Sequence, residues 1–244
     1  MRRIMILAGV LCTACGGAEA PVPEPPAAPA FAPQPPAERV ASAAVRAGRH
    51  ELARLERPVL LRSTPGGRRL ARIGTRTEFG SRTVLGVVGH RPGWLRVVAT
   101  QRPNGKRGWI PMASARLSRT DLALHVDRSA RRLTVRRGDR LLRRVRIAVG
   151  RPGTPTPTGR FAVTDRLHPA RADSPYGCCA VALTGHQTKL VPGWPGGDRL
   201  AIHGTPRPET VGEAVSLGCM RAHRRDIEWI MARIPLGTPV FIRA

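Results

Sequence analysis

Short apolar runs separated by turn residues dominate the first half of the chain. Turn chemistry such as Pro92-Gly93 and Asn104-Gly105 lies between the runs, and an Asn-Gly pair favours a hairpin because both residues tolerate positive φ. Strands of this length at this spacing predict a small β-barrel over residues 50–118. The runs are Val59–Leu61, Val84–Val88, Trp94–Val98 and Trp109–Ile110.

The second half, residues 119–244, carries a similar pattern. It opens with the apolar stretches 122–127, 133–135 and 141–149, which are joined by polar turns. Arginines alternate with apolar residues in this part of the chain, as expected for half-buried strands with one solvated face. The sequence therefore predicts a second unit that is also mainly β.

One amphipathic helix is expected near the end of the chain, over His223–Ile234. Its apolar residues recur with the spacing of a single helical face. Pro235 ends the helix, and Pro239–Ile242 is predicted to be the last strand. The expected fold class is thus mainly β with one short helix on the C-terminal side.

The first residues resemble an export signal. Arg2 and Arg3 precede the apolar stretch 4–11, which leads into small residues. The run Thr13-Ala14-Cys15-Gly16 resembles a bacterial lipobox, which predicts a signal over 1–14 and acyl chains on Cys15. Cleavage after Ala20 and a retained N-terminal anchor are the alternatives.

Residues 15–49 would then hold the lipid-anchor cysteine and a linker. The stretch 20–37 is almost entirely proline and alanine, a composition that favours extended polyproline II over a packed core. We expect an exported lipoprotein that faces the cell wall, in the periplasm or on the outer face of the plasma membrane.

The net charge of the chain limits the classes of binding partner that we expect. The chain has 41 Lys+Arg against 16 Asp+Glu, a formal net charge of +25, which suggests nucleic acid, anionic lipid or a wall polymer. No nucleic-acid-binding motif accompanies the arginines, so nucleic acid is not expected. His and Cys spacings fit no common zinc pattern, so no metal is expected.

A cysteine near the C-terminus is a candidate nucleophile. Cys219 follows Gly218, with Arg221 two residues later and His203 sixteen residues earlier. An imidazole and a guanidinium nearby are expected to lower the pKa of the thiol, and the glycine would let backbone amides face a developing oxyanion. A buried structural cysteine is the alternative.

This pattern resembles that of the bacterial L,D-transpeptidase family, with its YkuD-like catalytic domain. The matching positions are His203-Gly204-Thr205, Gly212 and Ser216-x-Gly218-Cys219-x-Arg221. The segments 149–161 and 235–240 also resemble the family, so the likeness covers about Asp121 to Ala244, within the unit predicted over residues 119–244. The preceding residues 50–118, which close with Gly108-Trp109-Ile110, resemble a bacterial SH3-like domain.

The resemblance implies a role for each matching residue. Cys219 would be the nucleophile, and His203 the general base and later the acid. Backbone amides at Gly218 and Cys219 would form the oxyanion hole, with Ser216 as support. Arg221 would bind a substrate carboxylate, because its guanidinium fork matches one.

Other residues are expected near the substrate. Thr205 belongs to the matching pattern and is a candidate substrate contact. His186 and Tyr176 lie in turn-rich segments and would either line the cleft or cap a loop. The vicinal pair Cys178-Cys179 would be free or disulfide-bonded, and the sequence leaves both open.

The family reaction is acyl transfer through a cysteine thioester. The resemblance implies that stem peptides of peptidoglycan are joined by 3→3 cross-links, without a cofactor, by a monomeric enzyme held to the membrane by its lipid anchor. The alternatives are an L,D-carboxypeptidase, an enzyme that anchors proteins to peptidoglycan, and a non-catalytic wall-binding lipoprotein.

Overall fold

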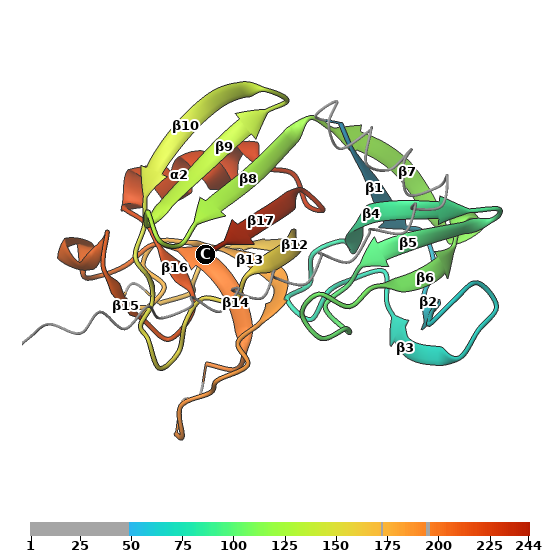
Figure 1. Ribbon diagram of the computed structural model, residues 1–244, viewed down its shortest axis with the longest axis horizontal. Helices are drawn as coiled ribbons and strands as arrows, with labels where there is room; N and C mark the ends of the chain where they lie inside the picture. The colour runs from blue at the N-terminus through green and yellow to red at the C-terminus, as the bar shows by residue number, and fades with distance from the viewer. Residues whose placement is uncertain (1–48, 172, 194–195) are drawn as a thin grey trace, which may run out of the picture. The chain divides into compact units, whose positions relative to one another are not determined.

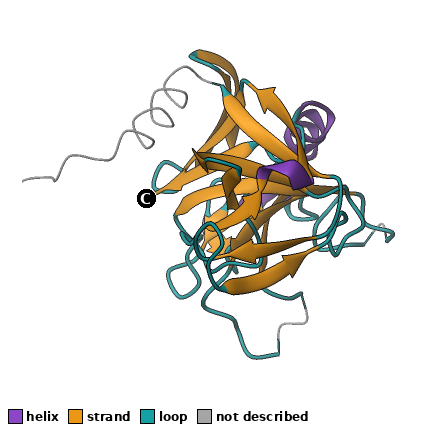
Figure 2. Ribbon diagram, turned by 90° about the vertical axis from the view of Figure 1, so that its right-hand side faces the viewer, coloured by secondary structure: helices purple, strands orange, loops and turns teal. Residues whose placement is uncertain are grey.

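The computed structural model describes residues 49–171, 173–193 and 196–244. The predicted export signal, Cys15 and the Pro/Ala-rich stretch lie outside these described residues. Within the described part of the chain, no helix is long and apolar enough to cross a membrane. Strands are its predominant regular secondary structure (Figure 2), so the predicted fold class, mainly β, is confirmed.

Seven strands form the first sheet, in the order β3-β2-β6-β5-β4-β1-β7, and every pairing is antiparallel (Figure 1). The run predicted at Trp94–Val98 is a strand with those bounds, and it pairs with β4 on one side and β6 on the other. Its likeness to an SH3-like barrel stays a prediction. The strands are β1 (His50–Leu55), β2 (Val59–Arg62), β3 (Arg69–Ile73), β4 (Val84–Arg91), β5 (Trp94–Val98), β6 (Gly108–Pro111) and β7 (Ala115–Thr120).

Eight strands form the second sheet, in the order β10-β9-β8-β17-β12-β13-β14-β16. Two of its pairings are parallel, β8 with β17 and β14 with β16. The parallel pair of β14 and β16 lies at one edge of the sheet. It brings the chain segments of His203 and Arg221 together in register. The strands are β8 (Leu122–Asp127), β9 (Arg132–Arg137), β10 (Arg140–Arg146), β12 (Gly159–Leu167), β13 (Ala180–His186), β14 (Arg199–His203), β16 (Met220–Arg221) and β17 (Pro239–Arg243).

A small parallel pair and one α-helix complete the second unit. Strands β11 (Val149–Gly150) and β15 (Ala214–Ser216) pair with each other. Helix α2 (Arg224–Arg233) begins after His223 and ends before Ile234, close to its predicted bounds. Its apolar face joins the core of the second sheet, and Arg143 of β10 pairs with Asp226 at 2.6 Å.

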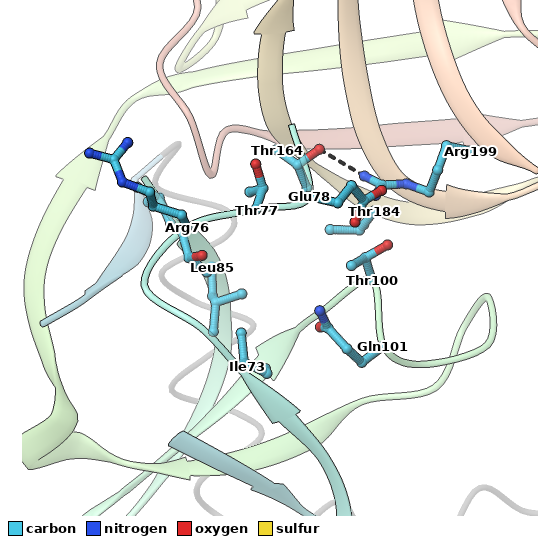
Figure 3. Close-up of a pocket in the computed structure, with 12 residues that line it drawn as sticks. Ile73, Arg76, Thr77, Glu78, Leu85, Thr100, Gln101, Thr164, Thr184 and Arg199 are labelled. Atoms are coloured by element: carbon cyan, nitrogen blue, oxygen red, sulfur yellow. Dashed lines mark hydrogen bonds and ion pairs between the residues drawn. The ribbon is translucent and has the colours of Figure 1, made fainter. Parts of the chain in front are cut away.

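Two short 3-10 helices lie in connections, η1 (Met112–Ser114) and η2 (Pro208–Thr210). The two sheets have separate apolar cores. Polar contacts join them: Thr77 donates to Asp165, Glu78 pairs with Arg199, and Arg107 donates to the carbonyl of Arg160 at 3.1 Å. A cavity of about 60 Å³ lies between them (Figure 3), so the sheets are closely packed along this seam.

Candidate active site

The parallel pair β14–β16 brings the segment that carries the predicted nucleophile to the strand that carries the predicted base. Register partners are Ile202 with Met220 and His203 with Arg221. Side chains alternate between the two faces along a strand, and register partners share a face. Cys219 directly precedes β16, and its Sγ lies 3.7 Å from the carbonyl oxygen of Arg199 in β14, the strand that ends at His203.

His203 is held in one tautomer. It is buried, with 4% of its surface exposed, and its Nδ1 lies 2.5 Å from the carbonyl oxygen of Gly204. A carbonyl only accepts, so Nδ1 carries the proton and Nε2 is free to accept one. The ring of Tyr176 packs edge-on against His203, with centroids 5.0 Å apart. The imidazole is thus oriented from two sides.

The resting pair is neutral. Burial lowers the pKa of His203 to about 4, and the charge of Arg221 acts in the same direction. Burial raises the pKa of the Cys219 thiol, outweighing the amide of Ala201 and the guanidinium of Arg221, which lower it. The expectation of a net lowered thiol pKa is therefore wrong, because desolvation of the thiolate exceeds both stabilising effects. Only the sign of the Arg221 effect was predicted correctly.

Ser216 braces the turn that carries Cys219. Its hydroxyl donates to the carbonyl of Cys219 at 2.6 Å and accepts the N–H of Gly218 at 3.0 Å. Two threonines of the Thr154–Thr156 stretch fix the same turn from outside. Thr154 donates to the carbonyl of Ser216 at 3.1 Å, and Thr156 donates to that of Gly218 at 2.8 Å.

Gln187 contacts this turn, and sequence reasoning did not single it out. The side chain is buried, and its Nε2 donates to the carbonyl of Leu217 at 2.8 Å. A Cβ on Gly218 would lie 2.1 Å from that Nε2, and Gly218 has φ +123°, so both space and backbone conformation require glycine. A glutamine after an apolar strand is an ordinary polar residue until the fold brings it to the turn.

Arg221 is poised for a negatively charged group. Its Nε is buried and has no hydrogen-bond partner among the described residues. Burial lowers the pKa of Arg221, and so does the nearby charge of the exposed Arg207. Thr205 is half-buried, and its hydroxyl accepts the N–H of Arg207 at 3.1 Å. Both arginines therefore belong to one cationic side of the site.

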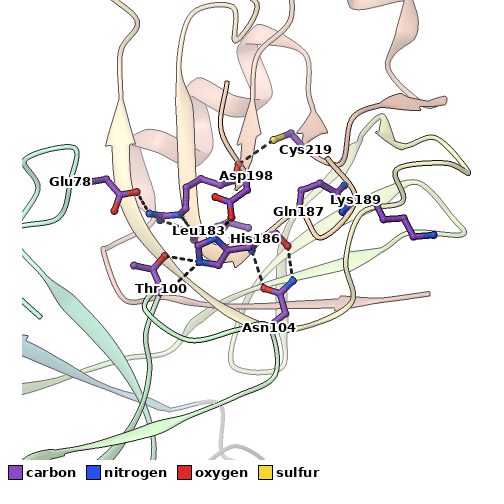
Figure 4. Close-up of polar contacts among 10 residues, drawn as sticks. Glu78, Thr100, Asn104, Leu183, His186, Gln187, Lys189, Asp198 and Cys219 are labelled. Atoms are coloured by element: carbon purple, nitrogen blue, oxygen red, sulfur yellow. Dashed lines mark hydrogen bonds and ion pairs between the residues drawn. The ribbon is translucent and has the colours of Figure 1, made fainter. Parts of the chain in front are cut away.

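His186 lies at the seam between the sheets (Figure 4). Its Nδ1 lies 2.9 Å from Asp198, and its Nε2 lies 2.7 Å from the carbonyl of Thr100. Its backbone exchanges two hydrogen bonds with the side chain of Asn104, at 2.6 and 2.9 Å. Both ring nitrogens are occupied by protein groups, so the geometry gives His186 a bracing position rather than a free cleft position.

The described residues contain no group of three or more His, Cys, Asp or Glu side chains that could hold a metal ion. The reactive side chains that the site brings together are a thiol, an imidazole held through its Nδ1, and a guanidinium. Such a set can carry out nucleophilic acyl transfer at a carbonyl next to a carboxylate.

Comparisons with known proteins point to the same chemistry. The family model of the L,D-transpeptidase catalytic domain (YkuD) matches residues 121–242, half of the chain. Curated relatives named as L,D-transpeptidases occur in Bacillus licheniformis and Bacillus subtilis. They are 33% and 32% identical over 117 residues, which is 48% of this chain and 62% and 63% of the relatives. The chain thus spans less than two thirds of their length.

Among solved structures, an L,D-transpeptidase from Mycobacterium tuberculosis H37Rv matches over 86% of both chains, with 21% identity and a TM-score of 0.43. A complex of LdtMt1, an LD transpeptidase, with imipenem matches over 66% of this chain and 91% of that chain, with 18% identity and a TM-score of 0.41. The family model and the curated relatives carry the comparison.

Proposed function

The chain belongs to the L,D-transpeptidase family, and on that premise we propose that it forms 3→3 cross-links in peptidoglycan through a thioacyl intermediate on Cys219. The observation that supports this most is the position of Cys219, whose Sγ lies 3.7 Å from the carbonyl oxygen of Arg199 on β14, the strand that ends at His203; the His203 ring is oriented through its Nδ1 contact with Gly204. The partners are stem peptides of peptidoglycan.

The first half-reaction uses the neutral pair. His203 Nε2 takes the thiol proton while Cys219 Sγ bonds to the carbonyl carbon before the terminal D-alanine of a tetrapeptide stem. Because Gly218 already donates its N–H to Ser216, the oxyanion is assigned to the N–H of Cys219. The C–N bond breaks, His203 returns the proton to the leaving amine, and D-alanine departs.

The second half-reaction forms the cross-link. The side-chain amine of a neighbouring stem attacks the thioester carbonyl and gives a proton to His203, which passes it to the departing Cys219 sulfur. Arg221, whose buried Nε has no hydrogen-bond partner in the described part of the chain, binds a carboxylate of the stem. Thr205 and Tyr176 line the same side of the substrate site as Arg221. His186 holds the end of β13 in place.

The acceptor decides between variants of this activity. Water as acceptor would give an L,D-carboxypeptidase, and a lysine of another protein would give an anchoring enzyme. The fuller proposal places the enzyme outside the cytoplasm as a monomer, with Cys15 lipidated and residues 50–118 as an SH3-like domain against the wall. These proposals rest on the sequence.

Purified protein incubated with tetrapeptide muropeptides tests the reaction. D-alanine release and dimer formation are expected, and Cys219→Ala should abolish both because no nucleophile remains. His203→Ala should slow the reaction by about 100-fold or more. His90→Ala, an exposed histidine of the first sheet, is the matched control and should retain full activity.

A second readout checks the nucleophile without a stem peptide. A carbapenem should acylate Cys219, giving one adduct by intact mass that is missing in Cys219→Ala. Retained D-alanine release by Cys219→Ala would rule out the mechanism. A protein that binds sacculi but never releases D-alanine would support a wall-binding role instead.

A further inference from the structure

Two adjacent cysteines lie immediately before β13, outside the proposed catalytic machinery. Cys178 and Cys179 are free thiols, and their sulfur atoms are 2.7 Å apart. Cys178 is partly exposed, whereas Cys179 is fully buried in the core of the second sheet. Cys178 is therefore the less buried of the two residues, and the sulfur of Cys179 lies against it from the side of the core.

The segment that carries this pair packs directly on the proposed base. The carbonyl of Cys179 accepts the N–H of Gly204 at 3.0 Å, and the carbonyl of Gly204 in turn holds His203 Nδ1. A Cβ on Gly204 would lie 3.3 Å from Cys178 Sγ. The two segments are therefore in close contact, with little room for one to move alone.

The same two segments also approach each other closely at Gly177 and Thr205. A Cβ on Gly177 would lie 2.6 Å from the backbone nitrogen of Thr205. Tyr176, one residue earlier, contributes the ring that packs on His203. A change in the backbone at residues 176–179 is thus transmitted to the imidazole through a hydrogen bond, a backbone contact and a ring contact.

We propose that Cys178 and Cys179 are a redox site at which a hydroperoxide closes a vicinal disulfide and displaces His203 from its catalytic position. The effect on activity rests on the proposed function, whereas the oxidation itself does not.

One hydroperoxide molecule supplies the two-electron oxidation that converts the two thiols into a disulfide. The thiolate of Cys178 attacks the peroxide oxygen, the O–O bond breaks, and a sulfenic acid and an alcohol or water result. Cys179 sulfur then attacks the sulfenic sulfur, the S–S bond forms, and water leaves with the thiol proton. Burial and the neighbouring Cys178 raise the pKa of Cys179 to about 12, so Cys179 stays protonated and Cys178 reacts first.

Closing this ring strains the backbone. Adjacent Cα atoms are about 3.8 Å apart across a trans peptide, shorter than the roughly 4.4 Å lower limit of ordinary disulfides. The peptide between the cysteines must rotate, and the carbonyl of Cys179 that holds Gly204 moves with the backbone. Strained disulfides are also readily reduced, so the oxidation should be reversible by a dithiol.

Peptide mapping of the full chain tests the site. Trypsin cuts after Arg171 and Lys189, giving a peptide 172–189 that contains Cys178, Cys179 and no other cysteine. The Cys219 peptide, 200–221, is read from the same digest. After graded hydrogen peroxide and alkylation, peptide 172–189 should become unalkylated and about 2 Da lighter at doses where Cys219 still alkylates fully.

Activity is measured at those same doses. D-alanine release should fall at least tenfold and return after dithiothreitol, whereas Cys178→Ser should keep its activity at the same peroxide dose. If peptide 172–189 still carries two alkyl groups when Cys219 is oxidised, the redox site is overturned. A disulfide that leaves activity unchanged overturns the coupling to His203. A reduced protein that releases no D-alanine contradicts the proposed function alone, since the mass shift is still read.

Discussion

At the scale of single residues, burial decides the protonation of the catalytic pair. The pKa of His203 falls to about 4 and that of Cys219 rises, so the resting state is a thiol beside a neutral imidazole. A preformed thiolate–imidazolium pair would require the opposite shifts. The thiolate is therefore formed during the reaction, when the substrate carbonyl takes over the developing charge.

The lowered pKa of His203 predicts that kcat/KM decreases only at unusually low pH. The free enzyme needs His203 neutral, so kcat/KM should fall with a midpoint near pH 4 rather than about 6.5, the ordinary histidine value. Arg221→Gln should move the midpoint upward, because the guanidinium disfavours the imidazolium. D-alanine release between pH 3.5 and 8 measures it, with intrinsic fluorescence recording that the protein stays folded. A wild-type midpoint near 6.5 would contradict the role of burial.

At the scale of elements, the turn before β16 is held by segments distant in sequence. Gln187 follows β13 and donates to the carbonyl of Leu217. The backbone of His186 in turn exchanges two hydrogen bonds with the side chain of Asn104, which lies in the loop between β5 and β6 of the first sheet. We call this pair of hydrogen bonds the clasp. The first sheet thus supports the strand end from which Gln187 reaches the catalytic turn.

Removing the clasp should affect turnover more than substrate binding. Asn104→Ala deletes both hydrogen bonds to the backbone of His186, so kcat should fall about 3- to 10-fold with KM nearly unchanged, and the free energy of unfolding should drop by about 1 to 2 kcal/mol. Gln101→Ala, an exposed neighbour in the same loop, is the matched control. An unchanged kcat in a destabilised Asn104→Ala would show that the clasp serves stability alone.

Apolar runs in the sequence predicted some elements better than others. The run Trp94–Val98 and the helix near 223–234 match the structure closely, because a run bounded by turns or a one-sided apolar face is a local signal. Strand β13 was not predicted, since Ala180–His186 is buried almost throughout and shows no alternation. Its register with β14 depends on partners that local patterns do not specify.

At the scale of the whole molecule, the arginine-rich strand β9 keeps the alternation of buried and exposed positions that the sequence indicates. In β9, Leu133 and Val135 are buried and Arg132 and Arg137 are exposed, as the alternating arginines predicted. Two histidines, in contrast, are buried and uncharged: His203 in the second sheet and His50 in the first. His50 packs near Phe241 of β17 at 6.1 Å between ring centroids, which ties the first sheet to the second.

These buried histidines make stability depend on pH. Burial lowers the pKa of both to about 4, so the unfolded chain binds their protons more tightly than the folded protein does. The free energy of unfolding should therefore decrease as the pH falls from about 6.5 to about 4, by up to about 3 kcal/mol for each histidine, and the contribution of these two histidines changes no further below that range.

Urea titrations at pH 7 and pH 4.5 measure the effect. His50→Phe should reduce the difference between the two pH values, because the proton that His50 takes up on unfolding is removed. His90→Phe, at an exposed site, should leave the difference as in the wild type. Equal pH dependence in wild type and His50→Phe would show that His50 does not contribute.

The sequence by itself determined the residue types of the site, because Cys219, His203 and Arg221 lie in a recognisable pattern, and it determined the mainly β class through local apolar periodicity. Only the tertiary structure decided how those residues are charged and held. Desolvation of Cys219 depends on everything packed around it, and the support from Gln187 and Asn104 comes from segments about 30 and 115 residues away in the chain. Such effects arise only when the strands are brought together, so local sequence patterns do not encode them.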